Sequence, residues 1–335
     1  MRIGAHRGPE RCAPLSGCVS PSPADSNPSV PDRRLDAWLR SFVLPGILSA
    51  LSLALVGSSY PSSPRRLVRD DVGRDVPLHG TPRRIVSLAP SVTETLFALG
   101  AAEQVVGVTD QCNDPPQARA LPKVGGMIKP DWESILHLHP DLLVATTAGN
   151  DAGLIAQADD LKLPLYFTDA RDLDGLSRSI TRLADVTGRT DAGETLRRGM
   201  ARRIAAMSDK APPIARRRVL YLVWVDPPIV PGKNTFLDDA LRLAGLDSIT
   251  ADAPAGWPTY DLESILRGNP DWIVAARHNA EALQRLSMRP GWKDLEAVRA
   301  KRLITVSEGI ERPSPGVVDA MEELRDAIVR RQASR

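Results

Sequence analysis

The sequence contains two copies of one fifteen-residue segment. Residues 131–145 and 261–275 are identical at nine of fifteen positions, at an offset of 130 residues. In each copy an aspartate that can cap a helix precedes Glu, Ile and Leu at helical spacing, and a proline then ends the helix. The Asp-x-x-Val-Ala that follows is typical of a short strand buried on both faces of a parallel sheet. One repeat at so long an interval predicts two similar lobes rather than a solenoid.

The two halves also begin alike. In each half an apolar strand is followed by a proline-containing loop and by a helix that ends at a glycine. The alternation of strands and helices predicts an α/β protein with two Rossmann-like lobes and mostly parallel sheets. The expected strands are 83–88, 104–108, 164–167, 217–223 and 303–306, and the expected helices that open the lobes are 93–100 and 235–244.

A stiff connection is expected between the lobes. Residues 173–186 have a helical pattern closed by Gly188, and residues 191–208 form a longer run rich in Ala, Arg, Leu and Met without an interior proline. Eighteen residues of helix span about 27 Å, roughly the width of a domain. We therefore expect an N-terminal lobe over 68–190, a connecting helix over 191–210 and a C-terminal lobe over 216–335, with a ligand cleft between the lobes.

The N-terminal region has the pattern of a secretion signal. Residues 1–31 lack an apolar period, so we interpret them as a disordered leader or as residues upstream of the true start. Basic residues around 33–40 precede the apolar run 42–56, and small residues follow it, so 32–59 is interpreted as a signal peptide. The apolar run is shorter than the roughly 20 residues that span a bilayer. A periplasmic location is expected; an uncleaved anchor and a cytoplasmic apolar helix are the alternatives.

Composition excludes several classes of protein. With 42% hydrophobic residues and 25% charged residues the chain is neither a multi-span membrane protein nor a disordered one. A net charge of +2 creates no basic field that would attract nucleic acid. Three cysteines cannot form a disulfide framework, and Cys112 is expected to be a small buried residue. No cluster of Cys and His predicts a metal site, and neither a phosphate-binding loop nor a nucleophile elbow is present. No cofactor and no catalytic residue is predicted.

Specific motifs then resemble one family, over about residues 68–330. They are similar to those of class III periplasmic binding proteins, the helical-backbone receptors of ABC importers for cobalamin, siderophores and haem, and most resemble the cobalamin-receptor branch. The motifs are Arg84-Ile-Val-Ser-Leu-Ala-Pro-Ser-Val-Thr-Glu-Thr-Leu-Phe-Ala-Leu-Gly100, Val106-Gly-Val-Thr-Asp110, Lys123-Val-Gly-Gly126, Trp224-Val-Asp-Pro-Pro228, Leu243-Ala-Gly245 and Arg312-Pro-Ser-Pro315.

The resemblance implies a set of ligand contacts. In the cobalamin branch aromatic side chains from both lobes clasp the corrin, and the matching positions are Trp224 and Trp257. Gln111 stands where relatives often have tyrosine, and Met127 stands where a receptor of this branch has tryptophan, so the N-terminal side of the clasp is less aromatic. A methionine can still pack on a flat apolar face. The resemblance also makes Glu308 and Arg312 candidates for contacts with ligand amides.

The same resemblance implies a partner. Receptors of this family dock through one carboxylate per lobe onto arginines of a dimeric permease, which works with a cytoplasmic ATPase. The matching positions are Glu133 and Glu263, the glutamates of the internal repeat. The chain is thus expected to be a monomeric, non-enzymatic receptor that delivers a cobalamin-like corrinoid. The alternatives are the same fold with a ferric siderophore, haem or another metal chelate, an envelope hydrolase, and an anchored sensor domain.

Simpler interpretations of these residues stay open at this stage. Both glutamates lie in the first turn of a helix, where a carboxylate is favoured by the helix dipole alone. Trp224 ends an apolar strand and can belong to the core, as Trp272 is expected to do. Trp292 follows Pro290-Gly291 and is expected to be a surface or hinge packing residue, and Arg312 can be a solvated loop cation.

Overall fold

The computed structural model describes residues 65–209, 214 and 217–333. The chain divides into two compact units, 1–58 and 59–335, and the described residues belong to the second. The leader predicted over 1–31 and the signal peptide predicted over 32–59 therefore lie outside the described residues. Within the described part of the chain, no helix has both the length and the apolar character required to cross a membrane.

The first half forms a four-stranded parallel sheet in the order β4-β3-β5-β6. Every residue of β5 and β6 is buried, as expected for strands covered by helices on both faces. An antiparallel hairpin, β1 (Arg65–Arg69) with β2 (Asp75–His79), precedes this sheet. The strands are β3 (Ile85–Ser87), β4 (Val105–Val108), β5 (Leu142–Thr146) and β6 (Leu165–Thr168); the helices are α1 (Pro90–Ala98), η1 (Ala102–Gln104), η2 (Pro116–Ala120), α2 (Trp132–His137), α3 (Leu154–Asp160) and α4 (Leu173–Thr187).

The second half repeats this topology. Its parallel sheet has the order β10-β9-β7-β8, which matches the first sheet strand for strand when read from the other edge. The strands are β7 (Arg218–Leu222), β8 (Asp247–Ser248), β9 (Trp272–Ala276) and β10 (Leu303–Val306). The helices are α6 (Phe236–Leu243), α7 (Leu262–Gly268), η3 (Arg277–Asn279), α8 (Ala280–Ser287), η4 (Trp292–Asp294), α9 (Glu296–Arg299), η5 (Glu308–Glu311) and α10 (Val317–Ala333). The predicted α/β class with two mostly parallel sheets is confirmed.

The fifteen-residue repeat adopts the same local structure twice. Asp131 caps α2 by accepting a hydrogen bond from the backbone N–H of Glu133 (3.1 Å), and Asp261 caps α7 by accepting one from Ser264 (2.8 Å). Over 131–140 and 261–270 the alternation of buried and exposed residues is identical at all ten positions. The predicted caps are confirmed, and sequence identity here reflects an identical relation to the core.

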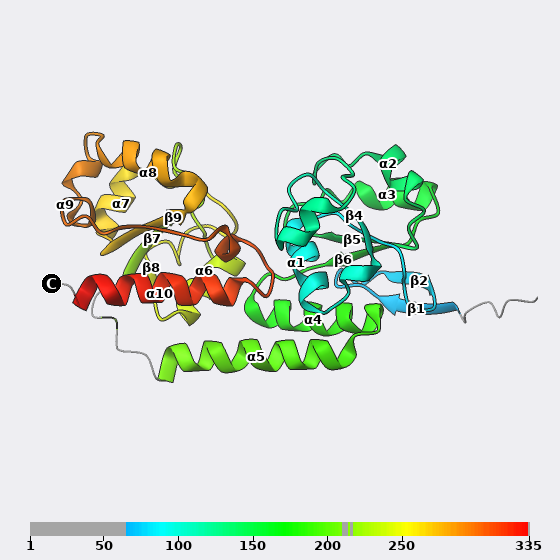
Figure 1. Cartoon of the computed structure of the whole chain (residues 1–335). Helices are drawn as coiled ribbons and strands as arrows, with labels where there is room; N and C mark the ends of the chain where they lie inside the picture. The colour runs from blue at the N-terminus through cyan, green and yellow to red at the C-terminus, as the bar shows by residue number, and fades with distance from the viewer. Residues whose placement is uncertain (1–64, 210–213, 215–216, 334–335) are drawn as a thin grey trace, which may run out of the picture. The chain divides into compact units, whose positions relative to one another are not determined.

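The segment between the two sheets contains a 20-residue helix, α5 (Thr190–Asp209). The preceding α4 ends at Gly188, whose φ of 70° is the left-handed conformation that glycine adopts without strain. Figure 1 shows α4 and α5 running side by side. Arg203 of α5 donates to Glu322 of α10 through Nε (2.9 Å) and Nη2 (2.6 Å), which ties α5 to the C-terminal helix.

The structure confirms some of the expected burial and helix boundaries and corrects others. Cys112 and Trp272 are buried, as predicted. Trp292 is not a surface residue: it is 5% exposed and packs in a core cluster with Leu283 and Leu286 of α8, because η4 lies in contact with that helix. The helix expected over 93–100 begins earlier, at Pro90, since a proline in the first turn lacks only an N–H that a helix start leaves unpaired.

Candidate ligand-binding site

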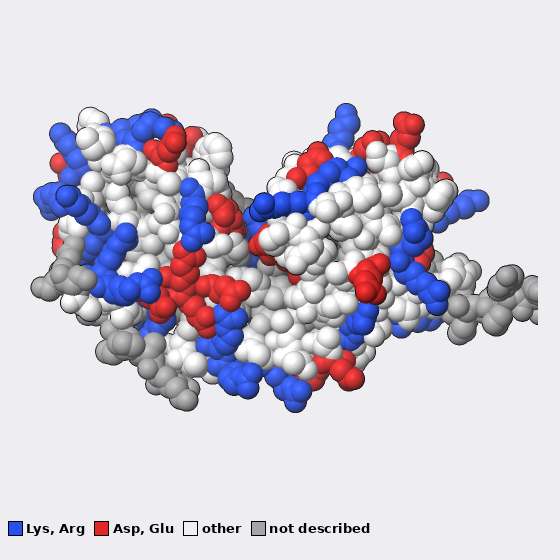
Figure 2. All heavy atoms as spheres, viewed as in Figure 1, with Lys and Arg blue, Asp and Glu red and all other residues white. Residues whose placement is uncertain are grey.

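A cavity of about 280 Å³ lies among loops that follow the carboxyl ends of strands in both sheets. Ligands of open parallel sheets bind at this end of the strands, because that is where the connecting loops converge. Figure 2 shows the surface hollowed between the halves that carry the two sheets, with acidic and basic side chains interspersed around it. The cavity is lined by Thr147, Ala148, Asp169, Ala170, Arg171, Asn234, Thr235, Phe236, Gly256, Trp257, Glu311 and Pro313.

Two half-exposed tryptophans lie on loops that are bridged to each other through Ile229. Trp257 lines the cavity and is 52% exposed, and Trp224 is 53% exposed, so Trp224 is not a core residue. Isolated bridges join Trp224 to Ile229 and Ile229 to Thr259, and the N–H of Val230 donates to the carbonyl of Pro258 (3.1 Å). These bonds hold the two tryptophan loops together, although only Trp257 lines the cavity.

Gln111 and Met127 meet in the first half of the molecule. The backbone N–H of Met127 donates to Oε1 of Gln111 (3.2 Å), and its carbonyl accepts from Nδ2 of Asn150 (2.8 Å). The thioether of Met127 packs so closely on Gly149 that a Cβ at that glycine would overlap it. Met127 is therefore half-buried beside the cavity wall at Ala148 without itself lining the cavity.

Glu308 and Arg312 already have protein partners. Oε1 of Glu308 accepts a hydrogen bond from the backbone N–H of His278 (3.2 Å). Nη1 of Arg312 donates to Oε1 of Glu94 on α1 (2.6 Å), and the two side chains are 30% and 10% exposed. Neither Glu308 nor Arg312 lines the cavity, although their neighbours Glu311 and Pro313 do.

Sequence reasoning missed several polar residues of the cavity wall. Asp169 accepts hydrogen bonds from Oγ1 of Thr147 (2.5 Å) and from Nε of Arg171 (3.2 Å). Glu311 accepts one from the hydroxyl of Tyr221 (3.0 Å), and burial raises the pKa of the Glu311 carboxyl. Asp169, Arg171 and Glu311 all follow the ends of predicted parallel strands, which is the signal that could have identified them.

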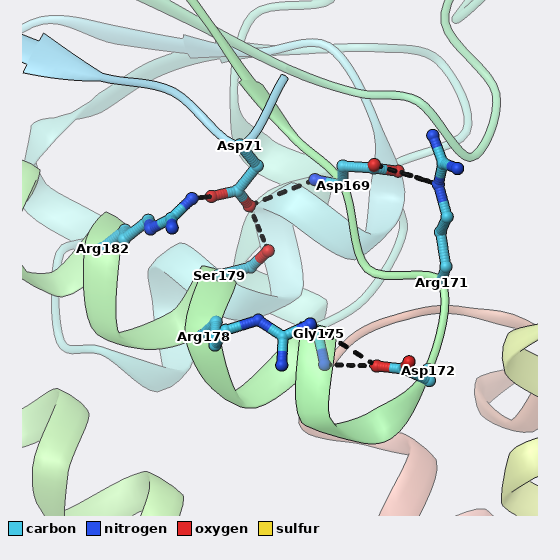
Figure 3. Close-up of a pocket in the computed structure, with 8 residues that line it drawn as sticks. All are labelled: Asp71, Asp169, Arg171, Asp172, Gly175, Arg178, Ser179 and Arg182. Atoms are coloured by element: carbon cyan, nitrogen blue, oxygen red, sulfur yellow. Dashed lines mark hydrogen bonds and ion pairs between the residues drawn. The ribbon is translucent and has the colours of Figure 1, made fainter. Parts of the chain in front are cut away.

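A larger and more polar cavity, of about 410 Å³, opens at the start of α4 (Figure 3). Its charged side chains are paired with one another. Asp71 accepts hydrogen bonds from Nη1 of Arg182 (2.9 Å), from the hydroxyl of Ser179 and from the backbone N–H of Asp169 (3.1 Å). Arg178 faces Asp172 at 3.9 Å. These pairings anchor the hairpin to α4, so we take the 280 Å³ cavity, with its aromatic wall, as the candidate site.

The two repeat glutamates are exposed in the first turns of α2 and α7. They differ in their surroundings. Glu263 accepts a hydrogen bond from Nη1 of Arg267 one turn later (2.7 Å), whereas His137 occupies the equivalent position after Glu133. Within the residues that the structure describes, Glu133 has no ion-pair partner.

Comparison with known proteins defines the class. A family model described as "Periplasmic binding protein" matches residues 85–308. The chain belongs to this family, whose members are the substrate-binding components of ABC transporters, and its fold is that of the class III receptors.

Three similar proteins show the range within the class. An uncharacterised ABC transporter substrate-binding lipoprotein of Bacillus subtilis, YvrC, is 30% identical over 274 residues, which cover 78% of this chain and 84% of YvrC. The structure of the periplasmic vitamin B12 binding protein BtuF of Vibrio cholerae has a TM-score of 0.63 and 25% identity, covering 75% of this chain and 98% of BtuF. The periplasmic heme-binding protein RhuT from Roseiflexus sp. RS-1 has a TM-score of 0.65 and 30% identity, covering 74% and 98%.

Proposed function

We propose that this chain captures a cobalamin-like corrinoid outside the cytoplasm and delivers it to an ABC import permease. The observation that carries the choice of ligand is the half-exposed Trp257 on the cavity wall, together with the half-exposed Trp224 on a loop that is bridged through Ile229 to the loop of Trp257. Exposed aromatic rings held rigidly offer a large apolar contact at little entropic cost, which suits a broad, flat ligand.

The charges of the cavity wall favour an uncharged ligand. Arg171 is paired with Asp169, and Glu311 adds a further carboxyl group, so the wall has no excess of positive charge. An anionic siderophore would meet no uncompensated cation there. A corrinoid carries neutral amide groups, which can both donate to Asp169 and accept from Arg171.

Haem is the second candidate, because RhuT is a heme-binding protein with 30% identity. Haem iron in proteins takes an axial ligand from His, Cys, Met or Tyr. Among the twelve described residues that line the cavity, none is of these four types. A cobalamin brings its own axial ligands and makes no such demand, so the lining favours it over haem.

The partner follows from the exposed carboxylates of the repeat. Glu133 and Glu263 occupy equivalent positions, one in each half, and project from the first turns of their helices. Two matched negative charges can register against paired arginines of a two-fold permease, and charge-assisted contacts of this kind fix orientation. We infer that these two residues dock the receptor on its permease.

Isothermal titration tests the choice of ligand. The purified protein is titrated with cyanocobalamin, haem and a ferric catecholate siderophore under the same conditions. We expect cyanocobalamin to bind at micromolar concentration or tighter and the other two to bind much more weakly. Haem binding without cyanocobalamin binding would replace the proposal by its second candidate, and siderophore binding alone would reject both.

A further inference from the structure

A largely buried charge contact between the two halves joins Glu94 to the segment 308–316. Glu94 lies on α1 in the first half and is 10% exposed. Its Oε1 accepts from Nη1 of Arg312 (2.6 Å), and its Oε2 accepts from the hydroxyl of Ser314, which is fully buried. The partners are 218 and 220 residues away along the chain.

Two residues of the same segment line the ligand cavity. Glu311 and Pro313 line it, and they alternate with Arg312 and Ser314, which point to Glu94. The segment has a second anchor in the second half, since Glu311 accepts the hydrogen bond from Tyr221 of β7 (3.0 Å). Among the described residues, the Glu94 carboxylate provides the side-chain hydrogen bonds that attach the segment to the first half.

We propose that Glu94 is a positioning residue for the ligand cavity: through Arg312 and Ser314 its carboxylate holds 308–316 against α1, and so sets where Glu311 and Pro313 stand. Arg312 then acts through Glu94 rather than by touching the ligand. The affinity part of this inference rests on the proposed binding of a corrinoid, whereas the ordering of the segment does not.

Loss of the Glu94 carboxylate should strongly destabilise the contact between α1 and the segment 308–316. A hydrogen bond to a charged group contributes more than a neutral one, and removing one partner leaves the other buried and unpaired. In Glu94→Ala both Arg312 and Ser314 would lose their acceptor. We expect the segment to move away from α1 locally, while the hydrogen bonds from Tyr221 to Glu311 and from His278 to Glu308 still hold it to the second half.

A double-mutant cycle separates positioning from direct contact. The variants are Glu94→Ala, Arg312→Ala and the double variant, with Glu94→Asp as the conservative change and Glu322→Gln as the control. Glu322 also receives a short Arg hydrogen bond, from Arg203, but between α5 and α10. Residues that act through each other show strongly non-additive effects.

Two measurements are made on each variant. Cyanocobalamin affinity is expected to fall about tenfold in both single variants, no further in the double variant, and less in Glu94→Asp. Amide hydrogen exchange of the ligand-free protein is expected to accelerate within 308–316 in both single variants. Glu322→Gln should change neither.

The affinity measurements and the hydrogen-exchange measurements each test the role of Glu94. If Arg312→Ala weakens binding while Glu94→Ala does not, or if the two effects add, Arg312 contacts the ligand and the inference is wrong. If exchange within 308–316 is unchanged in Glu94→Ala, the inference is also wrong. If the wild-type protein does not bind cyanocobalamin, the proposed ligand is rejected, and hydrogen exchange still tests the role of Glu94.

Discussion

Met127 and Trp257 occupy equivalent positions in the two halves: each stands four residues before the aspartate that caps its repeat helix, Asp131 or Asp261. Their surroundings have diverged. Met127 is half-buried against Gly149, whereas Trp257 is half-exposed and lines the cavity. The duplication thus provides two equivalent loops, of which the second presents a free aromatic ring.

Truncating this ring should cost affinity and little stability. In Trp257→Ala we expect cyanocobalamin to bind about tenfold more weakly or worse, because a stacked aromatic contact is lost. Because the side chain is half-exposed, the free energy of unfolding should change little. Titration calorimetry and urea unfolding measure the two effects. Met288→Ala, which removes an exposed apolar side chain in the same half, is the control and should bind normally.

The two repeat glutamates should contribute unequally to docking. Glu133→Gln should reduce stimulation of the permease ATPase more than Glu263→Gln, because Arg267 already neutralises part of the charge of Glu263. Arg267→Ala should then strengthen docking. The ATPase activity of the reconstituted transporter measures this, with ligand affinity expected to stay unchanged.

A second exposed Glu–Arg pair, on α8, provides the control for the docking experiment. Glu281 and Arg285 form an exposed pair one turn apart on α8, at 3.4 Å. Glu281→Gln should leave ATPase stimulation at the wild-type level. Equal losses in Glu281→Gln and Glu133→Gln would show a general effect of net charge and reject the docking role.

Two glycines of α5 should respond oppositely to alanine. A Cβ at Gly193 would overlap the Cβ of Ala184 on α4, so Gly193→Ala should lower the free energy of unfolding by about 1–3 kcal/mol. A Cβ at Gly199 meets nothing within 4 Å, so Gly199→Ala should raise it by about 0.5–1 kcal/mol. Urea unfolding checks both. A loss of stability in Gly199→Ala would contradict the packing described for α5.

The contributions of Glu94 and Glu322 to the free energy of unfolding should depend on pH in opposite directions. Burial raises the pKa of Glu94 above its ordinary value of 4.5, although Ser314 and Arg312 oppose the shift and Asp114 adds to it. The folded chain thus holds this proton more tightly than the unfolded chain, and the contribution of Glu94 to stability falls as pH rises from 4.5 through the raised pKa. The hydrogen bond from Arg203 lowers the pKa of Glu322, whose contribution is present above 4.5 and is lost as pH falls through the lowered pKa.

Unfolding by urea between pH 4 and pH 8 tests these signs. The difference in unfolding free energy between the wild type and Glu94→Gln should decrease with rising pH. The corresponding difference for Glu322→Gln should increase. Parallel pH profiles for the two variants would mean that burial does not govern the ionisation of Glu94.

The candidate site was only partly predictable. Trp257 was found because a tryptophan between Gly256 and Pro258 has a loop context, and the structure places it on the cavity wall. Asp169 and Glu311 were missed because their one signal, a position after the end of a predicted parallel strand, does not distinguish them from other residues of the same loops. Arg312 was identified by its motif, but its partner Glu94 could not be inferred from spacing along the chain.

The alternation of strands with helices, the duplication and the capping aspartates of the repeat were determined by the sequence alone, because periodicity, capping and turn preferences act over a few neighbouring residues. The hairpin β1–β2, strand β8 and helices α3 and α8 were not expected from the sequence. The tertiary structure decided which loops share a cavity, that the loops of Trp224 and Trp257 are bridged through Ile229, and that Arg312 donates a hydrogen bond to Glu94. Contacts between residues more than 200 positions apart depend on how whole sheets and helices pack, and that packing leaves no local signature in the chain.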